Sequence, residues 1–332
     1  MHNRPLGSTG LEVSEVGFGC GWTAGFMIRG DREAWRRGVA RATELGINFF
    51  DTSPVYGDGR SEEHLGQAIR DVGVRPLIST KVMLRTEELD GIPGAVTRSA
   101  EASLKRLQVD CIDVFLLHNF VSRSRSEAFP GVLSVDDITG PGGVADALDA
   151  LRRRGVIRST GFTGQGDVPA IIQLIESGRF GSVQLIYHVM NPTAGMTLRP
   201  GFRFAEFDRA IHRAAAQGMG VVAIRPLAGG ALGGKLDEPE RRPPPGSHGD
   251  RAWLEIQADV IRAKAYEFLP EEGQTMAQAA IRFVLTKPEI STVLVGVGRF
   301  EDIEPAAVCS DFGPLPSHDL DRLQEIYAHT IT

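Results

Sequence analysis

The chain alternates between short apolar runs and segments of helical periodicity, and this unit recurs eight times. Such alternation is expected when parallel strands are joined by crossover helices. The apolar runs are nearly continuous, as expected of strands that are covered on both faces. We expect strands at residues 15–19, 48–51, 77–81, 112–118, 159–163, 183–187, 221–224 and 292–295.

Between these strands the sequence predicts helices at residues 34–45, 62–72, 96–107, 144–154, 168–177, 204–217 and 276–286. Eight units favour closure into a single (β/α)8 TIM barrel that spans residues 1–332. An open doubly wound sheet is the main competitor. No GxGxxG motif follows the first strand, which argues against a dinucleotide-binding sheet of that kind.

Segments outside the repeating pattern predict a floor and a mouth for this barrel. Residues 6–14 are expected to form an N-terminal β-hairpin that closes the barrel floor. Two long irregular segments, 119–143 and 227–250, follow the fourth and seventh strands. Barrel active sites lie at the carboxyl ends of the strands, so we expect these segments to border the site.

Composition and charge narrow the class of partner. A net charge of −6 provides no basic field for nucleic acid or an anionic membrane surface. No stretch has the length and apolarity of a signal peptide or a membrane span, which predicts a cytoplasmic protein. Three widely spaced cysteines predict neither disulfides nor a metal site. We therefore expect a small-molecule partner, and the sequence leaves a homo-oligomer open.

Polar residues follow the second, third and fourth predicted strands: Asp51, Tyr56, Lys81 and His118. Reduction of a carbonyl by hydride needs a proton donor, and a phenol with a pKa of about 10 donates poorly unless its anion is stabilised. Lys81 would stabilise that anion, Asp51 would hold the lysine, and His118 would donate a hydrogen bond to the carbonyl oxygen. A purely structural Asp51–Lys81 ion pair is the alternative interpretation.

The segment 51–66, DTSPVYGDGRSEEHLG, resembles the signature of the aldo-keto reductase family around its catalytic aspartate and tyrosine. Residues 6–14 resemble the N-terminal hairpin of that family, and residues 78–81 and 113–118 resemble the strands that carry its lysine and histidine. The resemblance implies a nicotinamide cofactor bound across the barrel mouth without a Rossmann domain. It also implies that Tyr56 is the general acid/base and that His118 orients the substrate.

The same resemblance implies a set of cofactor contacts. Gln184 would contact the carboxamide, and Tyr187 would stack on the nicotinamide ring. Residues 296–304 would bind the adenosine end. Departures from the family pattern are Thr163 and Gly164 in place of Ser-Asn, Arg225 in place of a serine, and His188 in place of an asparagine. The Gln and the Glu-Asn that would bind adenosine are replaced by Asp302 and by Pro305-Ala306. The expected cofactor contacts are Thr163, Gly164, Gln184, Tyr187, Arg225, Pro226, Leu227, Gly229, Gly296, Arg299 and Asp302.

Arg299 is the candidate for a 2′-phosphate contact, because a guanidinium matches phosphate geometry. The sequence therefore predicts NADP(H), with NAD(H) as the alternative cofactor. Trp22 and Phe129 are expected, with His118, to line the substrate site.

We thus expect an NADP(H)-dependent oxidoreductase that acts on an aldehyde, a ketone, a sugar-like carbonyl or the corresponding alcohol. Two alternatives remain: a cofactor-binding regulatory or sensor subunit, and an isomerase or dehydratase that uses the cofactor transiently.

Overall fold

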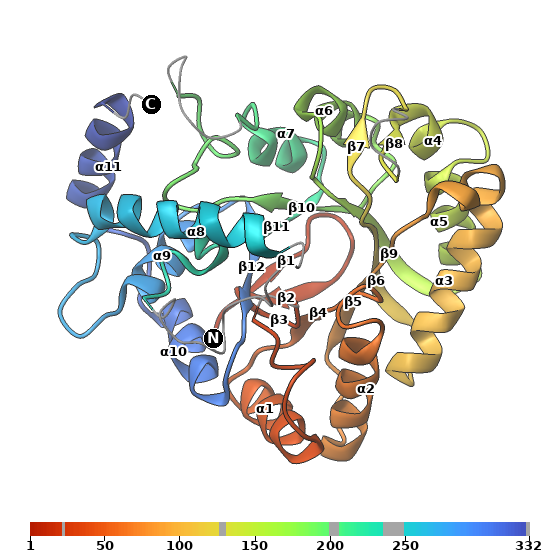
Figure 1. Ribbon diagram of the computed structural model, residues 1–332, viewed down its shortest axis with the longest axis horizontal. Helices are drawn as coiled ribbons and strands as arrows, with labels where there is room; N and C mark the ends of the chain where they lie inside the picture. The colour runs from red at the N-terminus through yellow and green to blue at the C-terminus, as the bar shows by residue number, and fades with distance from the viewer. Residues whose placement is uncertain (22–23, 126–130, 199–205, 235–248, 330–332) are drawn as a thin grey trace.

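The computed structural model, shown in Figure 1, describes residues 1–21, 24–125, 131–198, 206–234 and 249–329. Its centre is a closed barrel of eight parallel strands. The barrel closes where the last of these strands pairs with the first, Val293 lying opposite Val16. In order around the barrel the strands are β3 (Val16–Gly19), β4 (Phe49–Asp51), β5 (Leu77–Val82), β6 (Ile112–Leu117), β9 (Ile157–Thr163), β10 (Ser182–Ile186), β11 (Gly220–Ile224) and β12 (Ile290–Gly296).

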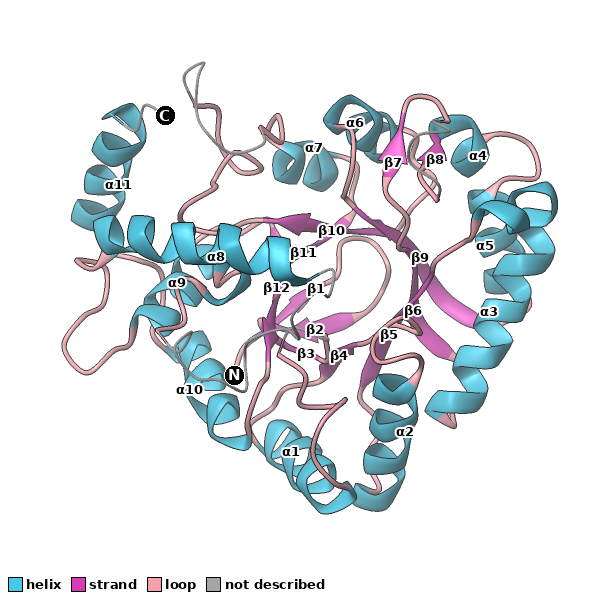
Figure 2. Ribbon diagram, viewed as in Figure 1, coloured by secondary structure: helices cyan, strands magenta, loops and turns pink. Residues whose placement is uncertain are grey.

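These strands confirm the predicted (β/α)8 fold. Figure 2 shows the helices as a ring outside the strands. The predicted helices correspond to α1 (Arg32–Glu44), α2 (Arg60–Val72), α3 (Ile92–Leu107), α5 (Val144–Arg153), α6 (Val168–Glu176), α7 (Ala210–Ala216) and α9 (Met276–Leu285).

The helix expected at 204–217 is shorter than its apolar pattern indicates. It begins at Ala210, because Asp208 and Arg209 adopt left-handed backbone angles, with φ values of 44° and 54°. Two consecutive left-handed residues cannot continue a right-handed helix. The predicted N-terminal limit is therefore wrong, and residues 199–205 lie outside the described part of the chain.

Several elements were not expected from the sequence. The segment 119–143 contains a short parallel pair, β7 (Val121–Ser122) with β8 (Leu133–Ser134), and then α4 (Val135–Thr139). Further helices are α8 (Gly249–Ala263), α10 (Ile303–Ala307) and α11 (Ser317–His329). Short 3-10 turns are η1 (Thr86–Gly91), η2 (Ala228–Gly230), η4 (Lys264–Tyr266), η5 (Phe300–Asp302) and η6 (Val308–Asp311).

An N-terminal hairpin closes the barrel floor, as predicted. Its first strand, β1 (Asn3–Pro5), lies before the predicted segment 6–14, whereas β2 (Glu12–Ser14) lies within it. Leu6, Leu11 and Val13 are buried against the inward-facing side chains Phe49, Val114, Leu116, Val222 and Leu294.

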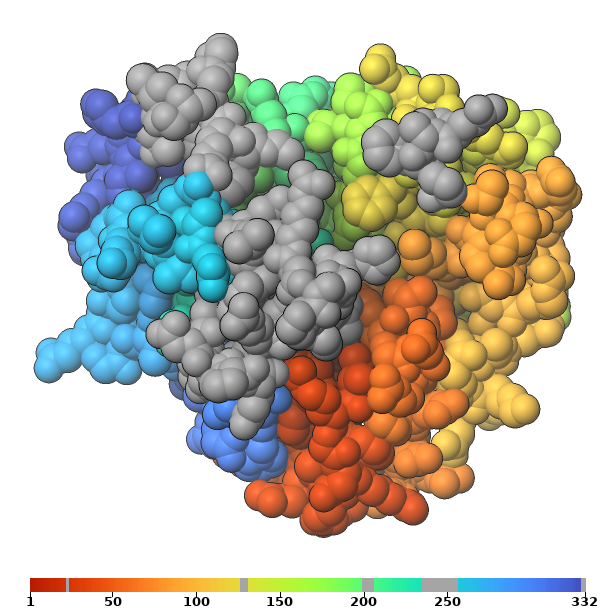
Figure 3. All heavy atoms as spheres, viewed as in Figure 1, coloured from red at the N-terminus to blue at the C-terminus, as the bar shows by residue number. Residues whose placement is uncertain are grey.

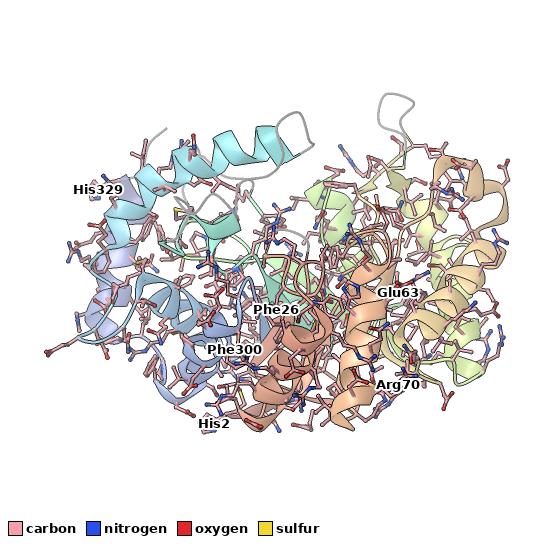
Figure 4. The ribbon with its side chains drawn as sticks, turned by 60° about the horizontal axis from the view of Figure 1, so that its bottom comes forward. His2, Phe26, Glu63, Arg70, Phe300 and His329 are labelled. Carbon is pink, nitrogen blue, oxygen red and sulfur yellow. The ribbon has the colours of Figure 1, made fainter. Side chains whose placement is uncertain are left out.

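The opposite end of the barrel is the mouth. Helix α8 reaches the loop that follows β11, where Ile256 lies next to Gly229. Figure 4 shows His2 at the lower edge of the molecule and α8 along the upper edge. Figure 3 shows that α8 and segments from the first third of the chain share this face. None of the helices in the described ranges combines the length and apolarity needed to cross a bilayer.

Candidate active site

A buried ion pair joins the ends of β4 and β5. Asp51 is the last residue of β4, and Lys81 lies near the end of β5. The Lys81 ammonium donates to Asp51 Oδ2 at 2.6 Å and to the main-chain oxygen of Thr52 at 2.7 Å. Lys81 is 0% exposed, so its charge is tolerated only because these acceptors replace water.

Tyr56 lies in the turn between β4 and α2 and brings its hydroxyl to the same ammonium. Lys81 Nζ donates to the Tyr56 hydroxyl at 3.3 Å and lies 4.8 Å from the centre of the tyrosine ring. The turn is held by two main-chain bonds, from Tyr56 N–H to Ser53 and from Ser61 N–H to Tyr56. It then reverses through Gly57, Asp58 and Gly59, which all have positive φ.

Burial and charge act in opposite directions on these groups. Burial raises the pKa of the Tyr56 hydroxyl, and the positive charge of Lys81 offsets only part of that rise. Burial lowers the pKa of Lys81, but Asp51 and Tyr56 outweigh this effect and raise it above its ordinary value. Lys81 thus makes the phenol more acidic, as expected, but burial outweighs this effect, so the pKa of Tyr56 lies above its ordinary value. Both directions favour a protonated tyrosine beside a charged lysine.

His118 directly follows β6 and faces the tyrosine. The two rings meet edge to face with their centroids 6.1 Å apart. His118 Nδ1 lies 3.0 Å from Thr163 Oγ1, at the end of β9. Burial, with Lys81 and Arg225 nearby, lowers the pKa of His118 to about 3. The imidazole is therefore neutral at physiological pH.

A chain of hydrogen bonds connects His118 to the ion pair. Gln184 on β10 donates from Nε2 to Asp51 Oδ1 at 2.7 Å, and Thr163 Oγ1 donates to Gln184 Oε1 at 3.4 Å. Gln184 was expected to contact a carboxamide. In the structure its amide also fixes Asp51, a role that the sequence did not suggest.

Supporting residues behind the ion pair were not anticipated either. Glu62, in the first turn of α2, is 0% exposed and accepts from Thr80 Oγ1 and from Arg106 Nε, both at 2.6 Å. These bonds tie α2 to β5 one residue before Lys81 and to the end of α3. The sequence did show Glu62 as an acidic residue in the first turn of a predicted helix. Its pairing with Arg106 could not be predicted, because the two residues are distant in sequence.

Tyr187 does not lie where its expected role requires. Its ring is 1% exposed and stacks on Phe283 of α9 with the centroids 5.2 Å apart. Side chains alternate between the two faces of a strand, so Gln184 points into the barrel and Tyr187 points outward. The assignment of Tyr187 as the ring under the nicotinamide is therefore corrected: both faces of this ring are covered by protein.

The loop after β11 offers main-chain donors and an exposed cation. Arg225 and Ala228 have positive φ values of 55° and 48°. Arg225 is exposed, and the structure gives it no ion pair with a described residue. Within the described ranges no residue accepts from the N–H of Leu227, which directly follows Pro226. Gly229 packs against Ile256 of α8, where a Cβ would lie 3.1 Å from that side chain.

The loop after β12 carries the last group of expected contacts. Gly296 is the exposed end of that strand. Asp302 accepts at Oδ2 from the N–H groups of Gly298 (3.3 Å) and Arg299 (3.0 Å), so it caps the following turn. The adenosine contact expected of Asp302 stays a prediction. Arg299 is half-buried at the start of that turn.

Four further positions were singled out beside the catalytic group. A Cβ at Gly164 would lie 2.7 Å from Leu185 Cδ2, so a side chain there would require that leucine to shift. His188 is buried at the mouth and accepts at Nδ1 from the N–H of Asn191 at 3.2 Å. Trp22 and Phe129 lie outside the described residues.

The structure thus brings together Asp51, Tyr56, Lys81 and His118 and adds Thr163 and Gln184 to them. The open N–H of Leu227 and the exposed Arg225 suit a phosphate group, and the phenol beside an ammonium suits the reacting end of a nicotinamide. These residues therefore fit a nicotinamide dinucleotide. No group of three or more potential metal ligands occurs in the described part of the chain.

The chain resembles known proteins over nearly its whole length. The sequence model of the aldo/keto reductase family matches residues 16–328. L-galactose dehydrogenase from Arabidopsis thaliana is 29% identical over 313 residues, covering 91% of this chain and 85% of that protein. A probable voltage-gated potassium channel subunit beta from the same plant is 26% identical over 360 residues, covering 98% and 96%. The holo form of an aldo-keto reductase from Bacillus halodurans has a similar fold, with a TM-score of 0.70, 24% identity and coverage of 100% and 98%.

Proposed function

This chain belongs to the aldo/keto reductase family, whose members are generally NAD(P)H-dependent oxidoreductases, and we propose that it moves a hydride between NADP(H) and a carbonyl or alcohol substrate. Tyr56 is the general acid/base in this proposal. The observation that carries it is the Tyr56 hydroxyl 3.3 Å from the Lys81 ammonium, which is itself paired with Asp51.

The residues of the site divide the work of proton transfer. When bound, the cofactor supplies the hydride for the carbonyl carbon or accepts it from the alcohol carbon. In reduction Tyr56 donates its hydroxyl proton to the carbonyl oxygen, and Lys81 stabilises the phenolate that remains. Asp51 keeps the ammonium in place and balances its charge. Because burial raises the pKa of Tyr56, the acid form is present at neutral pH.

The loops after β11 and β12, on the opposite side of the mouth from Tyr56, would bind most of the cofactor. Arg225 and the N–H of Leu227 would hold the phosphates, with the glycines of the loops after β11 and β12, Gly229 and Gly296, allowing a close approach. Thr163 and Gln184 would meet the carboxamide. Arg299 supports the choice of NADP(H), because it lies in the loop where the resemblance places the adenosine end.

Removing the Tyr56 hydroxyl tests the mechanism. Tyr56→Phe should lower kcat by about 10²- to 10⁴-fold, since the lost step is proton transfer. The dissociation constant for NADPH should change by less than about twofold, because the residues proposed to hold the phosphates are untouched. Turnover is measured as NADPH absorbance with a panel of aldehydes, ketones and alcohols. Unchanged turnover in this variant would contradict the assignment of Tyr56.

A second candidate function follows from the potassium channel subunit beta among the relatives. The chain would then be a regulatory or sensor subunit that binds the cofactor with little turnover. Tight NADPH binding without turnover on the whole panel would favour this function. Rapid NADPH oxidation with any carbonyl would exclude it.

A further inference from the structure

We propose that Glu62 is a positioning residue for proton transfer, because it sets the distance between the Tyr56 hydroxyl and the Lys81 ammonium. It acts together with Thr80 and Arg106, and we call these three residues the Glu62 clamp. The effect of the clamp on turnover rests on the proposed function. Its effect on the contact between the tyrosine and the lysine does not.

The barrel sheet alone does not fix this distance. The register of β4 with β5 ends at Asp51, which lies opposite Ser79. Tyr56 comes after the end of that strand, in a turn outside the sheet. Lys81, in contrast, is held within β5 by the pairing with β6, where it lies opposite Leu116. The position of the tyrosine relative to the lysine therefore depends on how the turn is attached to β5.

Glu62 makes this attachment with both of its carboxylate oxygens. Oε1 accepts from Thr80 Oγ1, and Oε2 accepts from Arg106 Nε, each at 2.6 Å. Thr80 directly precedes Lys81, and the alternation along β5 turns Thr80 outwards to α2 and Lys81 into the barrel. Among the hydrogen bonds of the described residues, this one joins α2 to β5. A movement of α2 away from β5 would therefore displace Tyr56 from Lys81.

Arg106 holds the same turn from α3. Gly59 belongs to the turn that carries Tyr56 and has a φ of 88°. A Cβ at Gly59 would lie 2.9 Å from Arg106 Cδ, so the stem of the arginine packs directly against the backbone there. Its guanidinium reaches Glu62. One arginine thus contacts the turn and, through Glu62, the start of α2.

Ser61 provides an attachment of a different kind. Its hydroxyl donates to the main-chain oxygen of Cys20 at 3.1 Å and lies 2.8 Å from the hydroxyl of Thr52. These two residues directly follow β3 and β4. Ser61 therefore fixes the turn to β3 and β4, whereas the Glu62 clamp fixes it to the strand that carries Lys81.

The charge of Glu62 strengthens the clamp. Glu62 and Thr80 are 0% exposed, and a buried carboxylate is tolerated here because Arg106 pairs with it. A hydroxyl that donates to a carboxylate makes a shorter and stronger hydrogen bond than one that donates to a neutral oxygen. The 2.6 Å distance between Thr80 and Glu62 is of this kind.

The position of Tyr56 is tested without turnover, by ¹³C NMR of tyrosine-labelled protein, with its Cζ signal assigned from the spectrum of Tyr56→Phe. Thr80→Val removes the hydroxyl at nearly the same shape. It should weaken the contact with Lys81 and move the signal towards that of free tyrosine. Thr80→Ser keeps the hydroxyl and should keep the wild-type signal. An identical Tyr56 signal in the wild type and in Thr80→Val would overturn the proposal.

Two further variants complete this experiment. Thr160→Val is the matched control, because it removes a buried hydroxyl from another barrel strand, β9, and should leave the Tyr56 signal unchanged. Glu62→Gln keeps an acceptor for Thr80 but not the charge. It should move the signal in the same direction by a smaller amount, and it replaces Thr80→Val if that variant does not fold.

Kinetics test the consequence for proton transfer. Thr80→Val should lower kcat by about tenfold or more and change KM by less than about twofold, since a misplacement of about 1 Å can cost about 10²-fold. In the background of Tyr56→Phe the same substitution should have no further effect, because the step that it disturbs is already lost. Equal losses in both backgrounds would show a general structural role and would overturn the positioning role.

The two measurements separate this inference from the proposed function. An active wild type whose kcat is unchanged in Thr80→Val would overturn the role of the clamp in proton transfer and leave the function of Tyr56 intact. If the wild type turns over no carbonyl, the proposed function falls. The NMR signal then still decides whether the Glu62 clamp positions Tyr56 against Lys81.

Discussion

The two sides of the barrel mouth are built on different principles. One side, the reactive rim, consists of Asp51, Tyr56, Lys81, His118 and Gln184 at the ends of β4, β5, β6 and β10. Its charged groups are buried and joined by side-chain hydrogen bonds. The other side, the loop rim, consists of Arg225, Leu227, Gly296 and Arg299 after β11 and β12. It presents the N–H of Leu227, for which no described residue is an acceptor, together with the exposed Arg225 and the exposed Gly296.

This difference indicates which parts of the site tolerate change. Proton transfer needs atoms held to within a fraction of an ångström, so the reactive rim is fixed by a connected network. A phosphate can be held by backbone N–H groups and mobile cations, whose side chains can vary. The departures from the family pattern at Arg225 and Asp302 lie in the loops after β11 and β12, and those at Thr163 and Gly164 lie beside the reactive rim. The four proposed catalytic residues, Asp51, Tyr56, Lys81 and His118, are all present.

The comparison is tested most severely by removing a charge from the reactive rim. Lys81→Met should lower the free energy of unfolding by about 3–5 kcal/mol, because it leaves Asp51 buried without its counter-ion. Arg225→Ala, from the loop rim, should change it by less than about 0.5 kcal/mol, because this side chain is exposed and has no ion pair with a described residue. Urea unfolding followed by circular dichroism measures both.

The double variant Asp51→Asn/Lys81→Met is the control for this prediction. It removes both charges, so it should recover part of the stability that Lys81→Met loses. Equal and small losses in Lys81→Met and Arg225→Ala would show that the two rims do not differ in this respect.

The same contrast explains how far the sequence could predict the molecule. The barrel follows from local patterns, since each strand is a short apolar run and each helix has its own periodicity. The catalytic residues follow from their places at strand ends. The pairing of Gln184 with Asp51 joins residues 133 positions apart and depends on the barrel radius, which no local pattern gives. Glu62 and Arg106 were missed for the same reason.

Tyr187 is a different case, because the sequence held evidence against its assignment. If Gln184 faces inward, the alternation along the strand places residue 187 on the outer face. The helix start at Ala210 could not be predicted, because left-handed angles at Asp208 and Arg209 depend on tertiary contacts. Trp22 and Phe129 lie outside the described residues, so their assignment to the substrate site stays a prediction.

The pH dependence of the free energy of unfolding tests the burial of two histidines at the mouth. Burial lowers the pKa values of His118 and His188 to about 3 and about 4, below the ordinary value of 6.5. Above about pH 6.5 each histidine is neutral in both the folded and the unfolded state. As the pH falls from about 6.5 towards the folded pKa, the histidine takes up a proton only in the unfolded state, so the free energy of unfolding decreases. The loss at pH 5 should be about 1–2 kcal/mol for each.

Urea unfolding at pH 7 and pH 5 measures this loss, and His188→Gln is the matched variant. Its free energy of unfolding should fall less between the two pH values, by the share that His188 contributes. An identical pH dependence in the wild type and in His188→Gln would show that this histidine is not held neutral by burial.

Changes in the loop rim should affect binding rather than folding. Arg225→Ala should weaken NADPH binding by about tenfold, because a charge-assisted hydrogen bond to phosphate is lost. Arg225→Lys keeps the charge without the planar guanidinium, so its dissociation constant for NADPH should lie between those of the wild type and Arg225→Ala. Fluorescence titration at two salt concentrations measures the change, and the wild type should show the steeper salt dependence. Equal dissociation constants in all three proteins would remove Arg225 from the cofactor site.

The smallest expected effect concerns the choice between the two cofactors. Arg299→Ala should weaken NADPH binding by about fivefold and NADH binding by less than about twofold, because only NADPH carries the 2′-phosphate. The turn itself should survive, since Asp302 is bonded to the main-chain N–H groups of Gly298 and Arg299 rather than only to a side chain. Fluorescence titration with each cofactor gives the ratio of dissociation constants. A wild type that binds NADPH and NADH equally would reject the preference for NADP(H), while leaving the proton chemistry of the reactive rim unchanged.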